Sequence, residues 1–152
     1  MKIQLMLVRH NKGLIPKIIR SLTNSEWDHV AIFIPSKGLV YENDLTTGVH
    51  SFPSSWLNTK QGKDLWSVKR VRTGMCISQE QLDKFSKEKY SLWHNFKTLA
   101  WNLNWFRRSI KPEKGHSNCV GYIARAAELP EDAQFAYPHN LKEWFDGNTT
   151  QR

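Results

Sequence analysis

The hydrophobic positions of this chain form short apolar runs in its first half and helical spacings in its second half. Apolar runs of about four to eight residues that are bounded by turn-forming residues are typical of buried strands. Such runs predict strands at residues 3–8, 30–34, 39–42, 49–52 and 65–71. Between the first two runs, Ile15, Ile18, Ile19 and Leu22 recur at helical spacing, and Pro16 suits the first turn of a short helix.

The second half of the chain is dominated by helical patterns. Ser78 and Gln81 have the spacing of a capping box, which predicts the start of a long helical region. One face of that region is expected to lie in the hydrophobic core: Trp93, Phe96, Ala100, Leu103 and Phe106. A short closing helix is expected to pack through Leu141, Trp144 and Phe145. The predicted fold class is α+β, with one domain over residues 1–152 and a small antiparallel sheet packed against helices.

Residues 117–122 (SNCVGY) lie where the chain is expected to turn from a loop into a helix. Apolar residues then follow at helical spacing: Val120, Ile123, Ala124 and Ala127. Because Ser117 or Asn118 can cap this helix, Cys119 is expected in its first turn. The unpaired N–H groups and the positive end of the helix dipole at that position favour the thiolate, which is the reactive form of cysteine. Cys119 is therefore the candidate nucleophile.

A thiol nucleophile needs a base, and His29 is the best candidate. It opens the apolar strand predicted at residues 30–34, so its side chain is expected to be held by a rigid element. His116 is closer to Cys119 in the sequence and is the reserve candidate. The other histidines are interpreted as ordinary polar residues: His10, His50, His94 and His139.

The group that orients the His29 ring is expected on the next strand. If Pro35 pairs with Gly38 around a two-residue loop, His29 lies opposite Asp44 and diagonal to Glu42, with all three side chains on one face. A register shift of one residue would place them on opposite faces. Glu42 is therefore the candidate for this role, and Asp44 is the alternative.

The order of these motifs resembles the circularly permuted papain-like hydrolases, the YiiX-like branch of the NlpC-type superfamily, which is related to lecithin:retinol acyltransferase-like enzymes. In that branch the histidine strand precedes the cysteine helix. The resemblance covers most of the chain and is carried by four short segments: residues 23–32 (TNSEWDHVAI), 40–42 (VYE), 48–49 (GV) and 118–122 (NCVGY). Members with a histidine as the third residue differ, because residues 39–44 contain no histidine.

The resemblance implies a permuted papain-like fold with a catalytic cysteine at a helix N-terminus. It assigns the catalytic cysteine, histidine and acidic residue to Cys119, His29 and Glu42. The implied activity is that of a cysteine hydrolase, of the amidase and peptidase type or of the thioesterase and acyl-transfer type, which forms a thioester with its substrate and needs no metal or organic cofactor. Members of the group act on peptidoglycan peptides, other amides and lipid esters, so the substrate can be a small molecule, a peptide or a lipid acyl group.

A competing motif lies at residues 7–11 (LVRHN), where Arg9 and His10 resemble the Arg-His-Gly start of the histidine phosphatases. In those enzymes the histidine is the nucleophile and arginines hold the phosphate. Here the expected glycine is replaced by Asn11, and no later segment offers a matching second histidine with its own glycine. The phosphatase is the less favoured interpretation.

The net charge is +8, and the basic residues occur in two clusters. The first comprises Lys2, Arg9, Lys12, Lys17 and Arg20, and the second Arg107, Arg108, Lys111 and Lys114. Such clusters can bind an anionic surface. Nucleic acid is not the expected partner, because no nucleic-acid-binding motif accompanies the charge. A second interpretation of the chain is a catalytically silent papain-like binding module that uses this basic face for an anionic partner.

The two cysteines give neither a disulfide framework nor a zinc pattern. Cys76 lies between Met75 and Ile77 and is expected to be a small buried apolar residue. The apolar start of the chain is too short for a signal peptide, and no stretch approaches the roughly 20 apolar residues of a membrane-spanning helix. These features predict a soluble, cytoplasmic protein in a reducing compartment.

Overall fold

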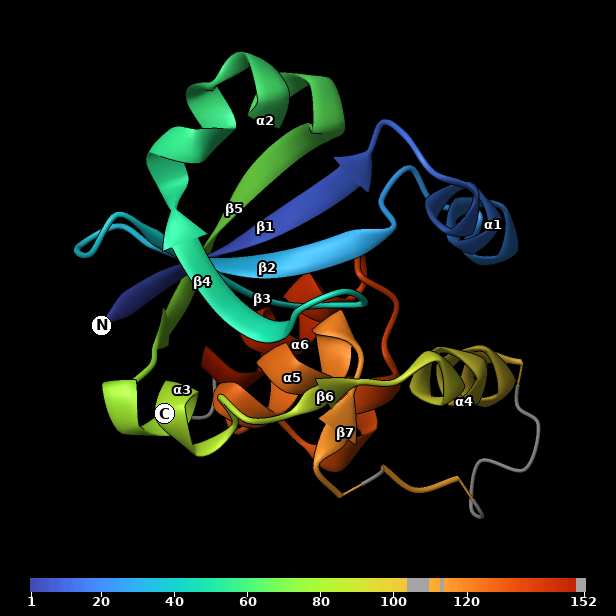
Figure 1. Ribbon diagram of the computed structural model, residues 1–152. Helices are drawn as coiled ribbons and strands as arrows, with labels where there is room; N and C mark the ends of the chain where they lie inside the picture. The colour runs from blue at the N-terminus through green and yellow to red at the C-terminus, as the bar shows by residue number, and fades with distance from the viewer. Residues whose placement is uncertain (104–109, 113, 150–152) are drawn as a thin grey trace.

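The computed structural model describes residues 1–103, 110–112 and 114–149, which form an α+β fold (Figure 1). Its centre is a five-stranded antiparallel sheet with the strand order β4-β3-β2-β1-β5. The strands are β1 (Lys2–His10), β2 (His29–Ile34), β3 (Leu39–Asp44), β4 (Gly48–Pro53) and β5 (Trp66–Cys76). The five strands predicted from the apolar runs are confirmed, and β5 extends further than its run indicated.

The β2–β3 hairpin has the register that the sequence predicted. Ile34 pairs with Leu39, and the register continues along both strands through the pair of Ile32 and Tyr41. Gly38 closes the turn with a φ of +64°, in the left-handed region that glycine adopts without strain. If this register is continued, His29, which is the first residue of β2, lies across from the last residues of β3.

Both faces of β2 are covered, which is why all six of its residues are buried. Alternate residues point to opposite faces of the sheet. Val30 and Ile32 pack in the larger core, which includes residues of α5 (Cys119–Ala126). Ala31 and Phe33 pack in a smaller core on the other face, against partly buried aromatic side chains that include Trp66. A strand buried on both sides is rigid, and His29 is its first residue.

The remaining helices are α1 (Leu14–Thr23), α2 (Lys60–Leu65), α3 (Gln79–Lys84), α4 (Leu92–Asn102) and α6 (Leu141–Thr149), with the 3-10 turns η1 (Ser54–Asn58) and η3 (Glu131–Phe135). In Figure 1, α5 and α6 lie below the sheet, α2 lies above it, and α1 and α4 lie on the right. The predicted closing helix corresponds to α6, in which Leu141 and Phe145 are fully buried and Trp144 packs against the core.

The long helical region expected after Ser78 is interrupted. The capping box of Ser78 and Gln81 is present, but it starts only the short helix α3. The chain then forms β6 (Lys89–Tyr90), which pairs in parallel with β7 (His116–Ser117), and Ser91 caps the new helix α4. Pairing with a segment distant in the sequence therefore overrides local helical propensity here.

The aromatic face predicted for α4 does not lie in the core. Trp93, Phe96 and Leu103 are about half exposed, Ala100 is buried, and Phe106 lies outside the described residues. The core-facing side of α4 is partly polar instead. It contains His94, whose ring stacks on Phe135, because this side of the helix packs against η3.

Helix α1 was predicted correctly in position, but none of its residues is buried. Cys76 was expected to be buried and is exposed, because it lies at the end of the edge strand β5, where the alternation of the strand turns it toward solvent. None of the described helices has the length and apolar character needed to span a membrane.

Candidate functional site

Cys119 is the first residue of α5. The side chain of Asn118 caps this helix and accepts a hydrogen bond from the backbone N–H of Gly121 at 2.8 Å. Gly121 is closely packed, because a Cβ there would lie 3.1 Å from Nε2 of His94 and 3.1 Å from Cβ of Ser117. Close packing around this first turn therefore determines where the Cys119 thiol lies.

The residue two positions before Cys119 is fixed by buried polar contacts. Asn43 on β3 donates to the backbone oxygen of Ser117 at 3.1 Å and to its hydroxyl at 3.0 Å. The Ser117 hydroxyl in turn donates to Glu88 at 2.5 Å, and Glu88 forms an ion pair with Arg125 of α5. Strand β3 and helix α5 are thus joined immediately before the cysteine.

His29 links Cys119 to Glu42. Its Nε2 lies 2.5 Å from Oε2 of Glu42, and its ring lies close enough to Cys119 for the two groups to interact. Burial alone would lower the pKa of His29, but the interaction with Cys119 and the hydrogen bond to Glu42 outweigh it and raise the pKa well above its usual value. The imidazolium form of His29 is thus favoured beside Cys119 and Glu42.

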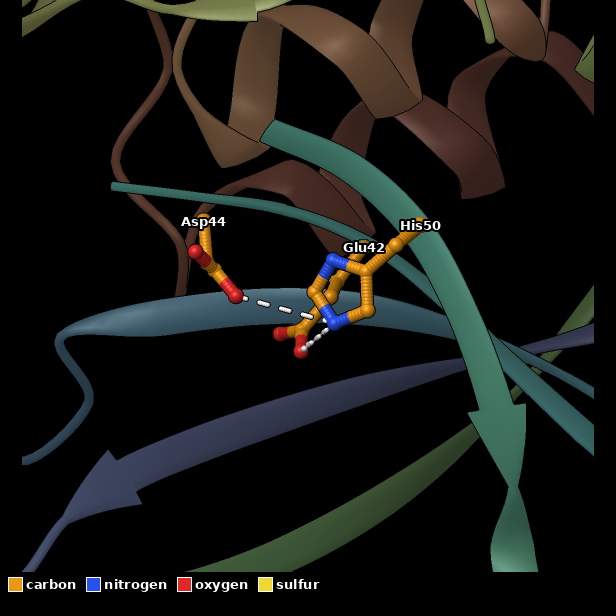
Figure 2. A group of neighbouring side chains, drawn as sticks. All are labelled: Glu42, Asp44 and His50. Atoms are coloured by element: carbon orange, nitrogen blue, oxygen red, sulfur yellow. Dashed lines mark ion pairs between the residues drawn. The ribbon is translucent and has the colours of Figure 1, made fainter. Parts of the chain in front are cut away.

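Glu42 is held by two histidines. Its Oε1 lies 3.1 Å from Nε2 of His50, which points from β4 toward the carboxylate (Figure 2). Burial would raise the pKa of Glu42, but the hydrogen bonds from His29 and His50 lower it overall. The hydrogen bond to Glu42 outweighs the opposing effect of burial and raises the pKa of His50 to about 9. Glu42 is therefore a carboxylate between two cationic rings at neutral pH.

Glu42, Asp44 and His50 place one ligand atom each within 4.8 Å of one another (Figure 2). Nε2 of His50 lies 3.6 Å from Oδ2 of Asp44, whose other oxygen accepts hydrogen bonds from Thr46 and Thr47. The raised pKa of His50 keeps its ring protonated at neutral pH, and the ring donates to Glu42. This group is accordingly an ion-pair network that orients Glu42.

A second histidine lies beside His29. The ring of His10 is 5.3 Å from that of His29, and Trp66 packs edge-on against both. Nδ1 of His10 lies 2.5 Å from Oδ1 of Asp28, and Arg20 of α1 forms an ion pair with the same carboxylate. His10 therefore belongs to the wall around His29, although the sequence suggested an ordinary polar role or phosphatase chemistry.

Tyr90 is the site residue with the least sequence signal. Burial raises the pKa of its phenol, and the charge of Cys119 raises it further, so the phenol keeps its proton. Asn118 donates to Asn95 at 2.9 Å, and Asn95 donates to the Tyr90 oxygen at 2.9 Å. Because the Tyr90 oxygen accepts this bond, its own O–H can donate to another acceptor.

Two cavities meet at this site. The first has a volume of about 340 Å³ and is lined by aliphatic residues together with polar and aromatic ones that include His10, His29 and Trp66. The second has a volume of about 350 Å³ and is lined by largely apolar residues together with Cys119. They share one wall: Ile15, Ile19, Asp28, Tyr90 and Leu92. The candidate base and the candidate nucleophile thus border neighbouring spaces.

The structure brings Cys119, His29 and Glu42 together and leaves other candidates apart. Asp44 contacts His50 rather than His29. His116 is exposed, and its Nδ1 lies 3.3 Å from the Lys114 backbone oxygen.

Three residues of the network were missed by sequence reasoning. They are His50, Asn43 and Tyr90. A signal existed for His50, because the turn before Gly48 fixes a β3–β4 register in which His50 is the partner of Glu42. No local signal marks Asn43 or Tyr90.

The basic clusters are only partly described. Lys12 and Lys17 are exposed, whereas Arg20 is bound to Asp28. In the second cluster Lys111 and Lys114 are exposed, and Arg107 and Arg108 lie outside the described residues. No protein-family model matches the chain, and comparisons with curated proteins and with solved structures find no match.

Proposed function

We propose that this protein is a cysteine hydrolase or acyltransferase in which Cys119 is the nucleophile, His29 is the base and Glu42 orients His29. One observation carries the proposal. The buried ring of His29 bonds to Glu42 at 2.5 Å and lies beside Cys119, although these three residues come from separate segments of the chain. A nucleophile, a base and a third polar group in this order are the arrangement of serine and cysteine triads.

We also infer a permuted papain-like arrangement. The antiparallel sheet packs against the helix that carries the cysteine, and the histidine strand precedes that helix in the chain. Cys76 and Cys119 are both free thiols, as chemistry by a thiolate requires. A reducing compartment such as the cytoplasm agrees with this requirement.

At the start of the reaction the proton of the Cys119 thiol has already passed to His29, which gives a thiolate–imidazolium pair, and the thiolate attacks the carbonyl carbon of the substrate. The negative oxygen that forms is stabilised by the backbone N–H of Cys119, which lies in the first turn of α5 and has no partner within the helix, and by the Tyr90 hydroxyl. The bond to the leaving group then breaks. His29 gives its proton to that group, and the acyl group remains on Cys119 as a thioester.

In the second half, His29 takes a proton from water, and the resulting hydroxide attacks the thioester. The carbon–sulfur bond breaks, the acid is released, and the thiol is restored. If an alcohol or an amine takes the place of water, the same steps transfer the acyl group. Glu42 stabilises the imidazolium in both halves, and His50 keeps Glu42 ionised.

Site-specific alkylation by iodoacetamide, read by mass spectrometry across pH, tests this proposal. Cys119 is buried and Cys76 is exposed, so accessibility alone predicts faster reaction at Cys76. We expect Cys119 to react faster than Cys76 below pH 7 and to slow in the His29→Ala variant. Hydrolysis of amide and ester substrates should be lost in Cys119→Ala. If Cys119 reacts as slowly as a buried, unactivated thiol and the variant changes nothing, the binding-module interpretation replaces the enzyme.

A further inference from the structure

An apolar groove lies between α1 and α4, and Cys119 is among the residues that line it. Figure 1 shows the two helices on the same side of the molecule. The volume of the groove is about 350 Å³. Sites for small organic ligands have volumes of roughly 300–1,000 Å³. The groove is therefore large enough for a ligand and leads directly to the candidate nucleophile.

Each of the two helices presents an apolar stripe to this groove. The stripes follow i, i+3, i+4, i+7 spacing, with Ile15, Ile18, Ile19 and Leu22 on α1 and Leu92, Phe96 and Leu99 on α4. Ile18 is 47% exposed and Phe96 is 50% exposed. Contiguous apolar surface that is left open to water marks a binding site, because its exposure lowers stability without a structural gain.

The shape of the groove suits a linear aliphatic chain. From Ile15 to Leu22, the α1 stripe extends about 10 Å at about 1.5 Å per residue. An extended hydrocarbon chain with bonds of about 1.5 Å covers that length with about eight to ten carbons. Most of the lining side chains are aliphatic or aromatic, so they offer few hydrogen-bond partners to a peptide backbone in this space.

The neighbouring cavity supplies the place for a polar head group. It contains His29 and shares the wall of Ile15, Ile19, Asp28, Tyr90 and Leu92 with the groove. A substrate that crosses this wall has its apolar part beside Cys119 and its leaving group beside His29. That orientation is the one the proposed acyl transfer requires.

The charges around the groove favour an anionic head group. Neither α1 nor the described part of α4 carries an acidic residue, and Lys12 and Lys17 are exposed near the start of α1. Two carboxylates line the cavity for the head group, and both already have cationic partners: Asp28 is paired with Arg20 and His10, and Asp44 with His50. The net charge of +8 adds a long-range attraction for anions.

We infer that the substrate of this site is an aliphatic acyl chain carried on an anionic head group, with the chain bound between α1 and α4. The chemistry of this inference rests on the proposed function, but the binding of the chain does not. Binding and turnover can therefore be tested separately.

Binding is measured with the Cys119→Ala variant and cis-parinaric acid, a fluorescent fatty acid. We expect saturable binding and displacement by dodecanoate, with weaker displacement by butanoate and by dodecyltrimethylammonium, which has the opposite charge. Adding Ile18→Asn should weaken binding at least tenfold. Leu103→Asn is the matched control, because Leu103 is also 47% exposed but does not line the groove, and it should leave binding unchanged. Absent binding, or equal loss in both variants, overturns the inference.

Turnover is measured with the wild-type protein and p-nitrophenyl esters of butanoate, octanoate and dodecanoate. We expect kcat/KM to rise by roughly threefold to fourfold for each methylene group that enters the groove, until the groove is filled. Hydrolysis with no dependence on chain length overturns the inference and leaves the proposed function standing. Fatty-acid binding without any turnover that depends on Cys119 supports the inferred binding of the chain and overturns the proposed function.

A bilayer is the alternative occupant of the exposed stripes. Sedimentation with phosphatidylglycerol vesicles separates it from a single bound chain. Binding to vesicles without binding of monomeric cis-parinaric acid would overturn the inference in favour of a membrane-docking surface. Binding of the monomer with an affinity that falls in the Ile18→Asn variant supports it.

Discussion

Oε1 of Glu42 lies 3.1 Å from Nε2 of His50, while Oε2 of the same carboxylate lies 2.5 Å from Nε2 of His29. Glu42 and His50 are register partners in the β3–β4 hairpin, so the backbone pairing sets their contact. The carboxylate is thus fixed from both sides. This arrangement fixes the orientation of the His29 ring in the site.

Glu42→Gln should lower kcat on the order of 10³-fold, because an amide can donate to Nε2 of His29 and stabilise the wrong tautomer. Asp44→Asn is the matched comparison, since Asp44 lies near His50 but does not contact His29. We expect an effect of about threefold or less in that variant. Steady-state kinetics on both variants decides between the two carboxylates, and equal losses would contradict the assignment to Glu42.

The stability of the protein should fall at alkaline pH because of His50. Its pKa is raised from 6.5 to about 9 in the folded state, so the folded protein binds more protons than the unfolded protein between these values. Its contribution is fully present below pH 6.5 and is lost as the pH rises through about 9. Urea unfolding from about pH 6 to pH 10 should show a shallower decline in His50→Gln than in wild type. Parallel curves would show that His50 is not the group responsible.

Tyr90→Phe should lower kcat by about 10–100-fold with little change in KM, because the lost O–H acts on the negative oxygen of the intermediate. Alkylation of Cys119 should keep its rate, since the thiolate itself does not depend on this donor. Tyr41→Phe serves as the control, because Tyr41 packs against the core and lines neither cavity. A loss of alkylation in Tyr90→Phe would indicate a structural role instead.

Gly121→Ala should destabilise the protein. The new Cβ would lie 3.1 Å from the buried His94 ring, and overpacking of this kind costs about 1–3 kcal/mol. The higher helix propensity of alanine offsets up to about 1 kcal/mol of this cost. Thermal unfolding of Gly121→Ala, His94→Ala and the double variant forms a cycle in which the two changes should partly compensate. Strict additivity would show that the predicted clash does not occur.

Asn43→Ala should lower the free energy of unfolding by about 1–3 kcal/mol, because it removes two buried hydrogen bonds to Ser117, whose carbonyl keeps the Ser91 N–H and whose hydroxyl keeps Glu88 as a partner. It should also slow alkylation of Cys119, since Ser117 lies just before the cysteine helix. Asn102→Ala is a suitable control, because Asn102 also donates to backbone oxygens, those of Thr98 and Phe135, but lies outside the site. An unchanged alkylation rate in Asn43→Ala would separate this contact from the reactivity of the thiol.

Local patterns were sufficient for the central sheet and for the pairing of His29 with Glu42. The β2–β3 register follows from the turn that ends at Gly38, and this register also determines which face each side chain occupies. The start of α5 was equally readable, because Asn118 and the apolar stripe after Cys119 are adjacent in the chain. Each of these features is set by neighbours within a few residues.

The features that were missed depend on partners far along the chain. Tyr90 belongs to β6 because it pairs with Ser117 on β7. This strand pairing interrupts the long helical region that the capping box at Ser78 had indicated. The core face predicted for α4 was wrong, because Trp93, Phe96 and Leu103 are about half exposed, and Phe96 lines the apolar groove. Phe96 illustrates this limit, since hydrophobic spacing is the same for a core residue and for a binding-site residue.

The wall shared by the two cavities has a consequence for how this protein can diversify. Changes at Ile15, Ile19 or Leu92 alter both cavities together, so they affect both ends of any ligand. Phe96 and Leu99 border only the apolar groove, and Thr46 and Trp66 border only the cavity that contains His29. Natural variation or directed evolution can therefore change preference for one end of a ligand through these outer positions while the other end is still accepted.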